Sequence, residues 1–437
     1  MEREYRMGTE VDEEAASRFL LDLAKALHLA YQPSLFVEDC VRRAAKAWGL
    51  KTEVFTVQSL AMTQVVAPRR SPAEFSRLPF NPHWNLGRAA ALLQLTDAIA
   101  AGGVGLPEAR ARLDRIAASS SPYPKWLVLL AYGVYGAAVA ARVGGGRWEM
   151  FAALLVGAIA GVIHFGTLTS QRVDLQKSFL AAFLGTLAAF GLRFVLPPFD
   201  VVQALFGGAV LLVPAMVVTL GSLELATESV EAGMTRLAYG LLRFLMLGVG
   251  ILAATKVWRF LGPLPVYSDA HVLSPLITFL VLAVGGVALA VCMAGRTRDL
   301  VGIVGGVLLA YGTQAGMKAV LGEQGSPMVA AFVLGVAGLL YGRGSQRMPM
   351  TVIMPGLLQL APGFMGTQAI IALLGLGRPG MEDARLFNVL LVALQLVLGL
   401  VFATLVVPPV RSGGPRRQRV ALWGERIWAA VQHRRPA

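Results

Sequence analysis

The stretch GGAVLLVPAMVVTLGSLELATESVEAGMTRLAY, residues 207–239, decides how the rest of the chain is interpreted. It begins as an apolar segment long enough to enter a bilayer, but it contains Pro214. A proline inside a helix removes one backbone hydrogen bond and clashes with the preceding turn. In lipid the freed polar groups need partners, so protein or a water-filled cavity must cover such a break.

Beyond Gly221 and Ser222 the same stretch takes on the pattern of an amphipathic acidic helix. Apolar and small residues recur there at helical spacing, namely Leu223, Ala226, Val230, Gly233 and Leu237. Glu224, Glu228 and Glu231 fall on another face, and residues 237–257 are apolar again. An interrupted span, an acidic turn and a second span favour a solute site. The plainer alternative is a proline-kinked helix followed by a solvated loop helix.

The composition indicates a membrane protein. Of the 437 residues, 56% are hydrophobic and 15% charged, which is too apolar for a soluble protein of this size. Long runs poor in charge extend over residues 126–407. The net charge of +13 comes largely from loops beside the spans and from the C-terminal tail, which fits anionic lipid headgroups better than nucleic acid. Cys40 and Cys292 indicate neither a disulfide framework nor a metal site.

Residues 1–123 are predicted to form a small α+β domain in the cytosol, because the first residues are too acidic for a signal or transit peptide. Periodicity predicts helices at residues 17–30, 33–50, 85–101 and 106–117, and a strand hairpin at residues 51–57 and 59–66. His28, Asp39, Cys40 and Glu53 are interpreted as isolated polar residues on surface helices. No catalytic, metal-binding or nucleotide-binding motif is present, so no cofactor is expected.

Ten apolar segments follow a linker at residues 119–124, each near the ~20 residues that cross a bilayer. They are residues 125–141, 149–168, 178–196, 200–221, 236–257, 272–294, 300–321, 326–341, 349–374 and 386–407. The sequence therefore predicts a polytopic α-helical membrane protein with two membrane halves, residues 124–260 and 261–410. Residues 411–437 form a basic amphipathic tail.

The distribution of Arg and Lys favours a cytoplasmic N-terminus and a cytoplasmic C-terminus. The inner loops then carry Arg172, Lys177, Arg296, Arg298, Arg343 and Arg347, and the arginine-rich tail also lies inside. The outer loops carry Arg142, Arg147, Lys256, Arg259, Lys318, Arg378 and Arg385. The tail is expected to lie on the inner surface of the plasma membrane, with Trp423 and Trp428 at the level of the anionic headgroups.

The fourth and ninth spans match, since each contains proline at a corresponding place. Val213-Pro214-Ala215 is set against Met354-Pro355-Gly356, and Gly221-Ser222 then falls opposite Pro362-Gly363. Five spans separate the two, an odd number, so the halves are predicted to be two inverted five-helix repeats. Inverted repeats with interrupted helices are typical of secondary transporters, whose solute site lies near the middle of the membrane.

An interrupted helix suits a small zwitterion, because its free N–H ends match a carboxylate and its free carbonyls match an ammonium group. The expected substrate-binding residues are Pro214, Thr219, Ser222, Glu224, Thr227, Pro355, Gln359, Pro362, Gly363 and Gln368, with Thr367 as a further hydroxyl. Glu224 or Glu228 would carry a proton, and Arg243 either pairs with one of these acids or extends to the interface. No ATP-binding motif is present, so an ion or proton gradient is expected to drive transport.

Several segments of the chain share the local sequence and the order of a known family, namely residues 37–43, 85–88, 123–128, 213–215, 354–356 and 361–363. They resemble the threonine/serine exporter family, whose members join a cytosolic N-terminal domain to ten spans. Residues 221–225 and 232–236 with Tyr239 are especially similar to the fungal-type branch of pheromone-regulated membrane proteins. The resemblance covers roughly residues 17–407 and implies export of threonine or serine.

The chain departs from that family at one place. Many bacterial members have an Asn and an Arg–Asp pair after the proline of the fourth span. Here the positions are Leu220, Leu223 and Glu224, so only the acid is kept. Split, two-chain relatives are associated with dicarboxylate export, whereas the acidic face at residues 224–231 suits an amino acid better than a dianion.

The sequence therefore predicts a proton-driven exporter of small amino acids that works by alternating access, and not an enzyme. Two alternatives stay open. One is export of small dicarboxylates such as succinate. The other is a membrane-anchored enzyme with a hydrolase-like N-terminal domain, although ten spans exceed what anchoring needs. Whether the protein forms a homo-oligomer is also open.

Overall fold

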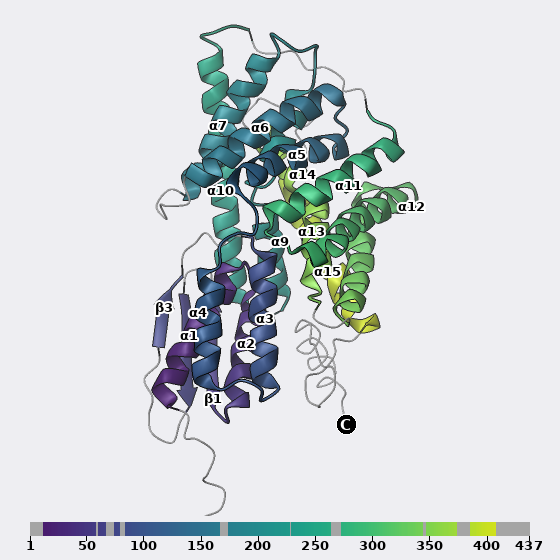
Figure 1. The fold of residues 1–437 in the computed structure, drawn as a ribbon. Coiled ribbons are helices and arrows are strands. Elements are labelled where there is room, and N and C mark those ends of the chain that lie inside the picture. The colour runs from purple at the N-terminus through teal and green to yellow at the C-terminus, as the bar shows by residue number, and fades with distance from the viewer. Residues whose placement is uncertain are drawn as a thin grey trace, which may run out of the picture. The chain divides into compact units, whose positions relative to one another are not determined.

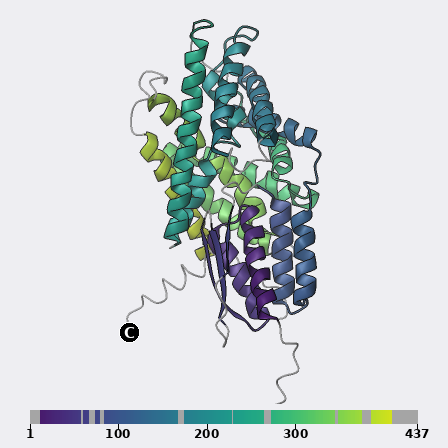
Figure 2. The ribbon, with the colours of Figure 1, turned by 90° about the vertical axis from the view of Figure 1, so that its left-hand side faces the viewer.

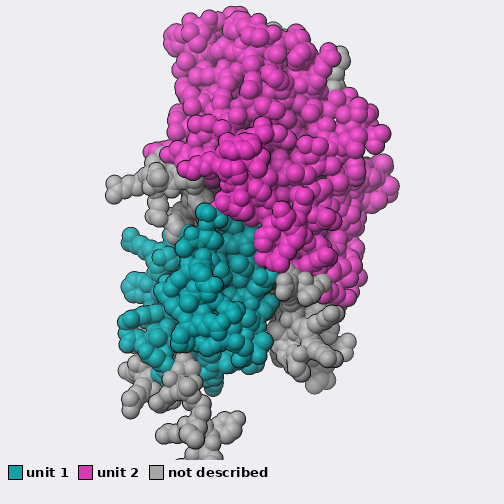
Figure 3. All heavy atoms as spheres, in the orientation of Figure 1, with its two compact units in different colours: residues 1–120, 412–418 teal, residues 121–411, 419–437 magenta. Residues whose placement is uncertain are grey.

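The computed structural model describes residues 12–57, 60–66, 74–78, 84–166, 174–227, 229–263, 272–343, 347–373 and 385–407. Glu228 and the basic tail at residues 411–437 therefore lie outside the described residues. The chain divides into two compact units, coloured separately in Figure 3. Unit 1 comprises residues 1–120 with 412–418, and unit 2 comprises residues 121–411 with 419–437.

Unit 1 combines four helices with an antiparallel sheet. The helices are α1 (Glu13–Leu29), α2 (Ser34–Ala47), α3 (Leu86–Ala100) and α4 (Leu106–Ala118), and the sheet has the order β1 (Lys51–Val57), β2 (Leu60–Val66) and β3 (Glu74–Arg77). The predicted helices and hairpin are present, with Lys51 opposite Val66 in the register. The third strand was not predicted.

The core of unit 1 follows the periodicity of its sequence. Phe19, Leu20, Leu23 and Leu27 share one face of α1 and are fully buried, as their spacing of three and four residues requires. This face packs on α2, α3 and α4, and α2 packs on β1. Figure 2 shows the sheet edge-on beside the helices.

Within its described residues, the secondary-structure elements of unit 2 are all helices, joined by turns and loops (Figure 1). Its helices are α5 (Lys125–Arg142), α6 (Arg147–Gly166), α7 (Asp174–Leu192), α8 (Val201–Ala209), α9 (Ala215–Ala226), α10 (Val230–Trp258), α11 (Pro275–Cys292), α12 (Leu300–Gly342), α13 (Met350–Leu360), α14 (Gly363–Leu373) and α15 (Arg385–Val406), with a short 3₁₀ turn at Thr297–Asp299. Each of the ten expected spans coincides with one of these helices, with part of α12, or with a pair of them.

Among the described residues of unit 2, six stretches are long and apolar enough to cross a membrane. They are Arg147–Gly166, Val230–Trp258, Pro275–Cys292, Thr297–Glu323, Gly325–Gly342 and Asn388–Val406. The helices at Gln176–Leu192 and Ala215–Ala226 are apolar but shorter. The protein is therefore a polytopic helical membrane protein, as the sequence predicted in outline.

The outer faces of these helices are apolar. Leu276, Leu280 and Val284, four residues apart on α11, are each more than half exposed. Leu390, Leu394 and Leu398 form a similar row on α15, and Leu396 on the other side of the same helix is fully buried. Continuous apolar faces of this kind mark surfaces that contact lipid or protein, and their spacing matches lipid-facing helices.

The seventh and eighth expected spans meet at Gly322 within α12. Gly322 has φ 70° and ψ −177°, a non-helical conformation that divides α12 into two helical parts. A positive φ favours glycine because it has no Cβ. Two spans therefore follow one another here with almost no loop.

The predicted amphipathic helix after Ser222 is wrong in its limits. α9 continues through Gly221 and Ser222 to Ala226, and α10 begins at Val230. Thr227 is the C-terminal cap of α9, and its hydroxyl donates to the carbonyls of Leu223 and Glu224, at 2.9 and 3.2 Å. Glu224 and Glu231 thus lie on either side of a tight turn between two antiparallel helices.

Candidate functional site

The first helix break lies between α8 and α9. Pro214 is the N-terminal cap of α9 and the backbone leaves the helical path after Ala209. The carbonyl of Leu212, inside the break, accepts long contacts from Arg243 Nη2 at 3.4 Å and Ser178 Oγ at 3.5 Å. Protein side chains therefore cover one backbone carbonyl inside the break, as the membrane environment demands.

The second break lies between α13 and α14, at Ala361 and Pro362. The pairing of Pro214 with Pro355 is therefore wrong, because α13 runs without interruption through Pro355. Ala361 has an extended ψ of 138° and ends α13, and α14 begins at Gly363. Pro362, and not Pro355, therefore lies at the second break.

The two breaks share a local sequence pattern. Thr219 follows Pro214 by five residues, and Thr367 follows Pro362 by the same interval. Each hydroxyl donates to the carbonyl four residues earlier: Thr219 to Ala215 at 3.1 Å, and Thr367 to Gly363 at 2.9 Å. Both threonines thus stabilise the first turn of a helix that starts inside unit 2.

The N-terminal ends of α9 and α14 meet. A Cβ at Gly363 would lie 3.0 Å from the Cβ of Ala215 and 3.2 Å from a methyl group of Val213, so any larger residue here requires these neighbours to move slightly. The rings of Phe206 and Phe364 pack beside it with centroids 5.1 Å apart. Helix N-termini carry partial positive charge and N–H groups without intrahelical partners. Their convergence creates a place suited to an anion.

Gln359 connects the second break to α5. Its side-chain amide donates to the hydroxyl of Tyr135 at 2.9 Å, and both side chains are buried. Gln359 lies two residues before Ala361. Sequence reasoning missed Tyr135, since a single hydroxyl within an apolar helix gives no distinctive pattern.

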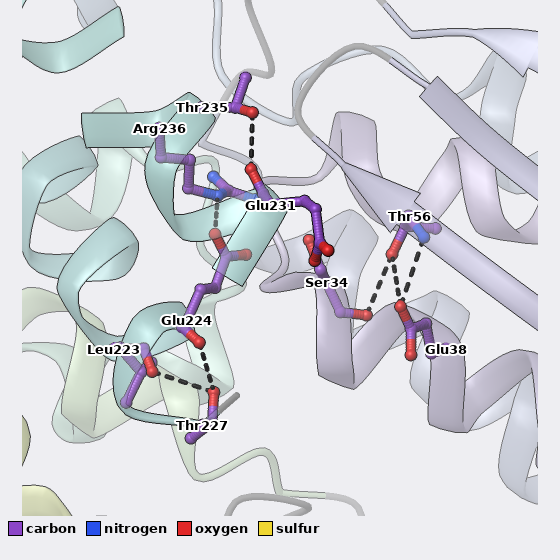
Figure 4. A network of polar contacts seen from close by, with 9 residues as sticks. All are labelled: Ser34, Glu38, Thr56, Leu223, Glu224, Thr227, Glu231, Thr235 and Arg236. Carbon is purple, nitrogen blue, oxygen red and sulfur yellow. Dashed lines mark hydrogen bonds and ion pairs between the residues drawn. The ribbon is translucent and has the colours of Figure 1, made fainter. Parts of the chain in front are cut away.

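Glu224 and Arg236 form an ion pair at the far end of α9. Arg236 Nε donates to Glu224 Oε2 at 2.7 Å, and both side chains are 1% exposed (Figure 4). Arg236 was not predicted as the partner. Arg243, for which pairing with an acid was one of two alternatives, contacts Ser178 Oγ at 3.2 Å and the Leu212 carbonyl at 3.4 Å. Glu224 follows Ala215 by nine residues, or about 13 Å along the helix, so the pair lies apart from the breaks.

A close crossing of α9 and α10 makes this pair possible. A Cβ at Gly233 would lie 2.8 Å from the carbonyl oxygen of Gly221. Side chains of a helix lean toward its N-terminus, so Arg236 extends back along α10 toward Glu224. Two glycines therefore bring the backbones together and leave the long side chains to meet.

A sequence model of the family described as "Putative threonine/serine exporter" matches residues 18–258, more than half of the chain. The chain belongs to the threonine/serine exporter family. Among curated relatives is Pheromone-regulated membrane protein 10 of Candida glabrata, 23% identical over 80% of this chain and 46% of the relative. The protein of the same name from Yarrowia lipolytica is 22% identical over 80% of this chain and 30% of the relative. The protein of the same name from Saccharomyces cerevisiae (strain S288c) is 25% identical over 61% of this chain and 71% of the relative.

The chain thus spans less than half the length of the first two of these relatives. No solved structure matches it. The family is one of exporters, which is not an enzyme class.

The remaining predicted residues of this exporter-family protein have varied positions. Ser222 is buried within α9, Thr227 caps that helix, and Gln368 lies half-buried on α14 beside Thr367. Glu228 lies outside the described residues. The predicted residues thus fall into a group at the breaks and a group around the α9–α10 turn, and α9 separates them.

Unit 1 contains a cluster of polar side chains whose role is to stabilise the fold. Arg43 Nη2 donates to Asp97 at 2.7 Å, and Arg43 also pairs with Asp39 at 3.5 Å. Burial raises the pKa of the Cys40 thiol to about 12, and so opposes formation of the nucleophilic thiolate. The sequence interpretation placed Cys40 and His28 on the surface, but both are buried within the helical core.

A second buried contact fixes α2 to the sheet. Glu38 accepts the backbone N–H of Thr56 at 3.3 Å, and the Thr56 hydroxyl donates to the Ser34 carbonyl at 3.3 Å (Figure 4). A hydrogen-bonded buried carboxylate of this kind holds two elements in register. Among the described residues, no group of three or more His, Cys, Asp or Glu side chains is placed to hold a metal.

Proposed function

We propose that this protein is a secondary transporter that exports threonine, serine or a similar small amino acid by alternating access. The single observation that carries the proposal is the meeting of two interrupted helices at Ala215 and Gly363. Interrupted helices that meet within a bundle of apolar helices characterise the solute sites of secondary transporters. Membership of the exporter family supports the same function.

We infer that unit 2 consists of ten spans in two inverted repeats. In this pairing α5 corresponds to α11, and α6 and α7 correspond to the first and second parts of α12. The interrupted pair α8 and α9 corresponds to α13 and α14, and α10 corresponds to α15. The contacts between helices support it, since α9 packs on α15 as α14 packs on α10, and α7 packs on α10 as α12 packs on α15. The matching Pro-to-Thr intervals after the two breaks support it independently.

The substrate carboxylate would bind at the N-terminal ends of α9 and α14, where the helix dipoles favour a negative charge. The amide oxygen of Gln359 and the carbonyls at the ends of α8 and α13 suit an ammonium group. Glu224 is engaged by Arg236 away from the breaks, which argues for a coupling role and against direct contact with the solute. Protonation of Glu224 would neutralise one partner, release Arg236 and link proton uptake to rearrangement of the α9–α10 turn.

Export of a small dicarboxylate such as succinate is the second candidate. Two converging helix N-termini favour anions, and the charge of Glu224 is balanced by Arg236. Both features suit a dianion better than the sequence alone suggested. Whether the substrate is a dicarboxylate or an amino acid depends on which group binds beside Gln359, a second carboxylate or an ammonium group.

The remaining assignments follow from the transport proposal. The protein would lie in the plasma membrane with both termini in the cytoplasm, and its tail at residues 411–437 would bind anionic headgroups. Unit 1 would act as a cytosolic gate, regulator or assembly module.

Counterflow in proteoliposomes tests the function. Vesicles loaded with unlabelled L-serine should accumulate labelled serine, and vesicles loaded with succinate should not accumulate labelled succinate. The reverse pattern would establish dicarboxylate export in its place. Absence of counterflow with serine, threonine and succinate would refute both candidates.

A further inference from the structure

Arg142 combines partial burial with an incomplete set of hydrogen bonds. It is the last residue of α5 and is half-buried, and its Nη2 donates to the side-chain oxygen of Gln314 on α12 at 2.9 Å. Its Nε is buried and has no hydrogen-bond partner among the described residues. No described carboxylate lies within ion-pair distance of the guanidinium.

Two other arginines of the same unit have carboxylate partners. Arg236 pairs with Glu224, and Arg296 pairs with Asp299 at 3.0 Å. Position at the C-terminal end of a helix favours a cation and explains why Arg142 is tolerated there. It does not explain a buried Nε, since a buried donor without an acceptor is costly and rare in native proteins. The guanidinium therefore has capacity for an anion.

A row of polar side chains leads from the second break toward Arg142. Tyr135 precedes Arg142 by seven residues, two turns of α5, so both lie on one face about 10 Å apart. Tyr135 receives the hydrogen bond from Gln359, whose own oxygen is buried without a described partner. Gln359 and Gln314 belong to the second membrane half, and Tyr135 and Arg142 to the first.

The row ends at a defined face of unit 2. Tyr123, just before α5, donates to the carbonyl of Gly295, so the start of α5 and the end of α11 share one face. Arg142 lies at the other end of α5, beside the turn to α6. Glu149 fixes that turn by accepting the N–H groups of Gly146 and Asp200, at 2.9 and 2.8 Å. We call the face that carries this turn the α5–α6 face.

We propose that Arg142 and Gln314 form a second carboxylate-binding site, between the helix breaks and the α5–α6 face. The inference rests on the proposed transport function and assigns a route to it. A carboxylate released from the ends of α9 and α14 passes Gln359 and Tyr135 and then binds Arg142. A planar guanidinium binds a carboxylate through two parallel hydrogen bonds, which lysine does not reproduce. The opening of the Arg142–Gln314 contact between the halves accompanies release.

The test compares Arg142→Gln, Arg142→Lys and Gln314→Glu with the wild-type protein in proteoliposomes. Arg147→Cys is the matched control, because Arg147 is an exposed cation five residues further on, and a membrane-impermeant maleimide at this cysteine reports orientation. Counterflow is measured with L-serine and with succinate, from each face. L-serinamide and succinamide, which lack carboxylates, serve as competitors.

For the carboxylate that the wild type carries, R142Q should raise the KM at least tenfold from the α5–α6 face and leave the KM from the opposite face unchanged. The amides should compete only weakly with the carboxylate for transport by the wild type. For transport by R142Q they should compete as well as the carboxylate does. The KM of R142K from the α5–α6 face should lie between those of the wild type and R142Q. Q314E places a carboxylate beside Arg142 and should raise the same one-sided KM even if R142Q does not fold. R147C should match the wild type.

Unchanged KM values in R142Q and Q314E, or equal increases from both faces, would overturn the second site while leaving the transport function intact. A wild-type protein that neither carries serine or succinate nor is thermally stabilised by them would overturn the function and the site together.

Discussion

The ion pair between Glu224 and Arg236 offers a quantitative test of how α9 and α10 are held. The perturbation is a double-mutant cycle of Glu224→Gln, Arg236→Gln and the combined variant. Glutamine at either position keeps hydrogen-bonding capacity and removes the charge. Glu231→Gln is the control, since Glu231 is exposed in the first turn of the same α10 helix.

The structure sets the expected magnitude. Nε and Oε2 are 2.7 Å apart and both side chains are 1% exposed, so water screens the pair little. Charge centres about 4 Å apart attract by about 4 kcal/mol at an effective dielectric constant of 20. Removing one partner of a buried pair costs about 3–5 kcal/mol, because the other charge stays buried without compensation. The double variant leaves no uncompensated charge and should lose less than the sum of the two single losses.

The assay is equilibrium unfolding of the purified protein in mixed micelles, followed by tryptophan fluorescence. Each single variant should lower the free energy of unfolding by about 3 kcal/mol, with a coupling energy of about 2–3 kcal/mol in the cycle. E231Q should stay within about 0.5 kcal/mol of the wild type. Transport gives a second measurement: E224Q should abolish gradient-driven export and keep part of the exchange.

Strictly additive losses would show that the two side chains do not interact as described. Unchanged uphill transport by E224Q would remove Glu224 from proton coupling, whatever its effect on stability.

Two further predictions follow from local packing. Gly233→Ala places a Cβ 2.8 Å from the Gly221 carbonyl, so it should destabilise unit 2 by about 1–3 kcal/mol in the same unfolding assay, whereas Gly305→Ala, where a Cβ meets nothing within 4 Å, should not. Because burial raises the pKa of Cys40 from its ordinary value of 9.0 to about 12, the unfolded chain binds fewer protons than the folded one between these values and stability should fall as pH rises through that window. Iodoacetamide labelling followed by mass spectrometry checks this, since folded protein should stay unmodified at Cys40 at pH 9, and rapid modification there would contradict the burial.

Much of the fold could be predicted from periodicity alone. The spacing of Phe19, Leu20, Leu23 and Leu27 identified the buried face of α1, because local hydrophobic pattern and helix geometry agree there. The apolar segments of unit 2 were located for the same reason. Strand β3 was missed because four residues, Glu74–Arg77, give too short an alternation to recognise.

The site was predictable in part. Pro355 and Pro362 both violate helix rules, and sequence alone does not say which one interrupts the chain. Packing decides, because Gly363 lets α14 start against Ala215, whereas Pro355 is buried within a continuous α13. The partner of Glu224 also depended on packing. Arg236 reaches it through the close approach of Gly221 and Gly233, which no local pattern of charges reveals.

Disulfide formation between Ala215→Cys and Gly363→Cys tests the central claim most directly, that two interrupted helices meet inside the membrane at the solute site. The Cβ atoms of the two positions would lie 3.0 Å apart, so the helix ends must separate slightly to reach the ~3.8 Å at which disulfides join Cβ atoms. The pair is placed in a background in which Cys40 and Cys292 are alanine, and is oxidised in native membranes. The account predicts rapid cross-linking that stops counterflow and is reversed by reductant. Failure to cross-link under conditions that oxidise an exposed control pair would contradict it.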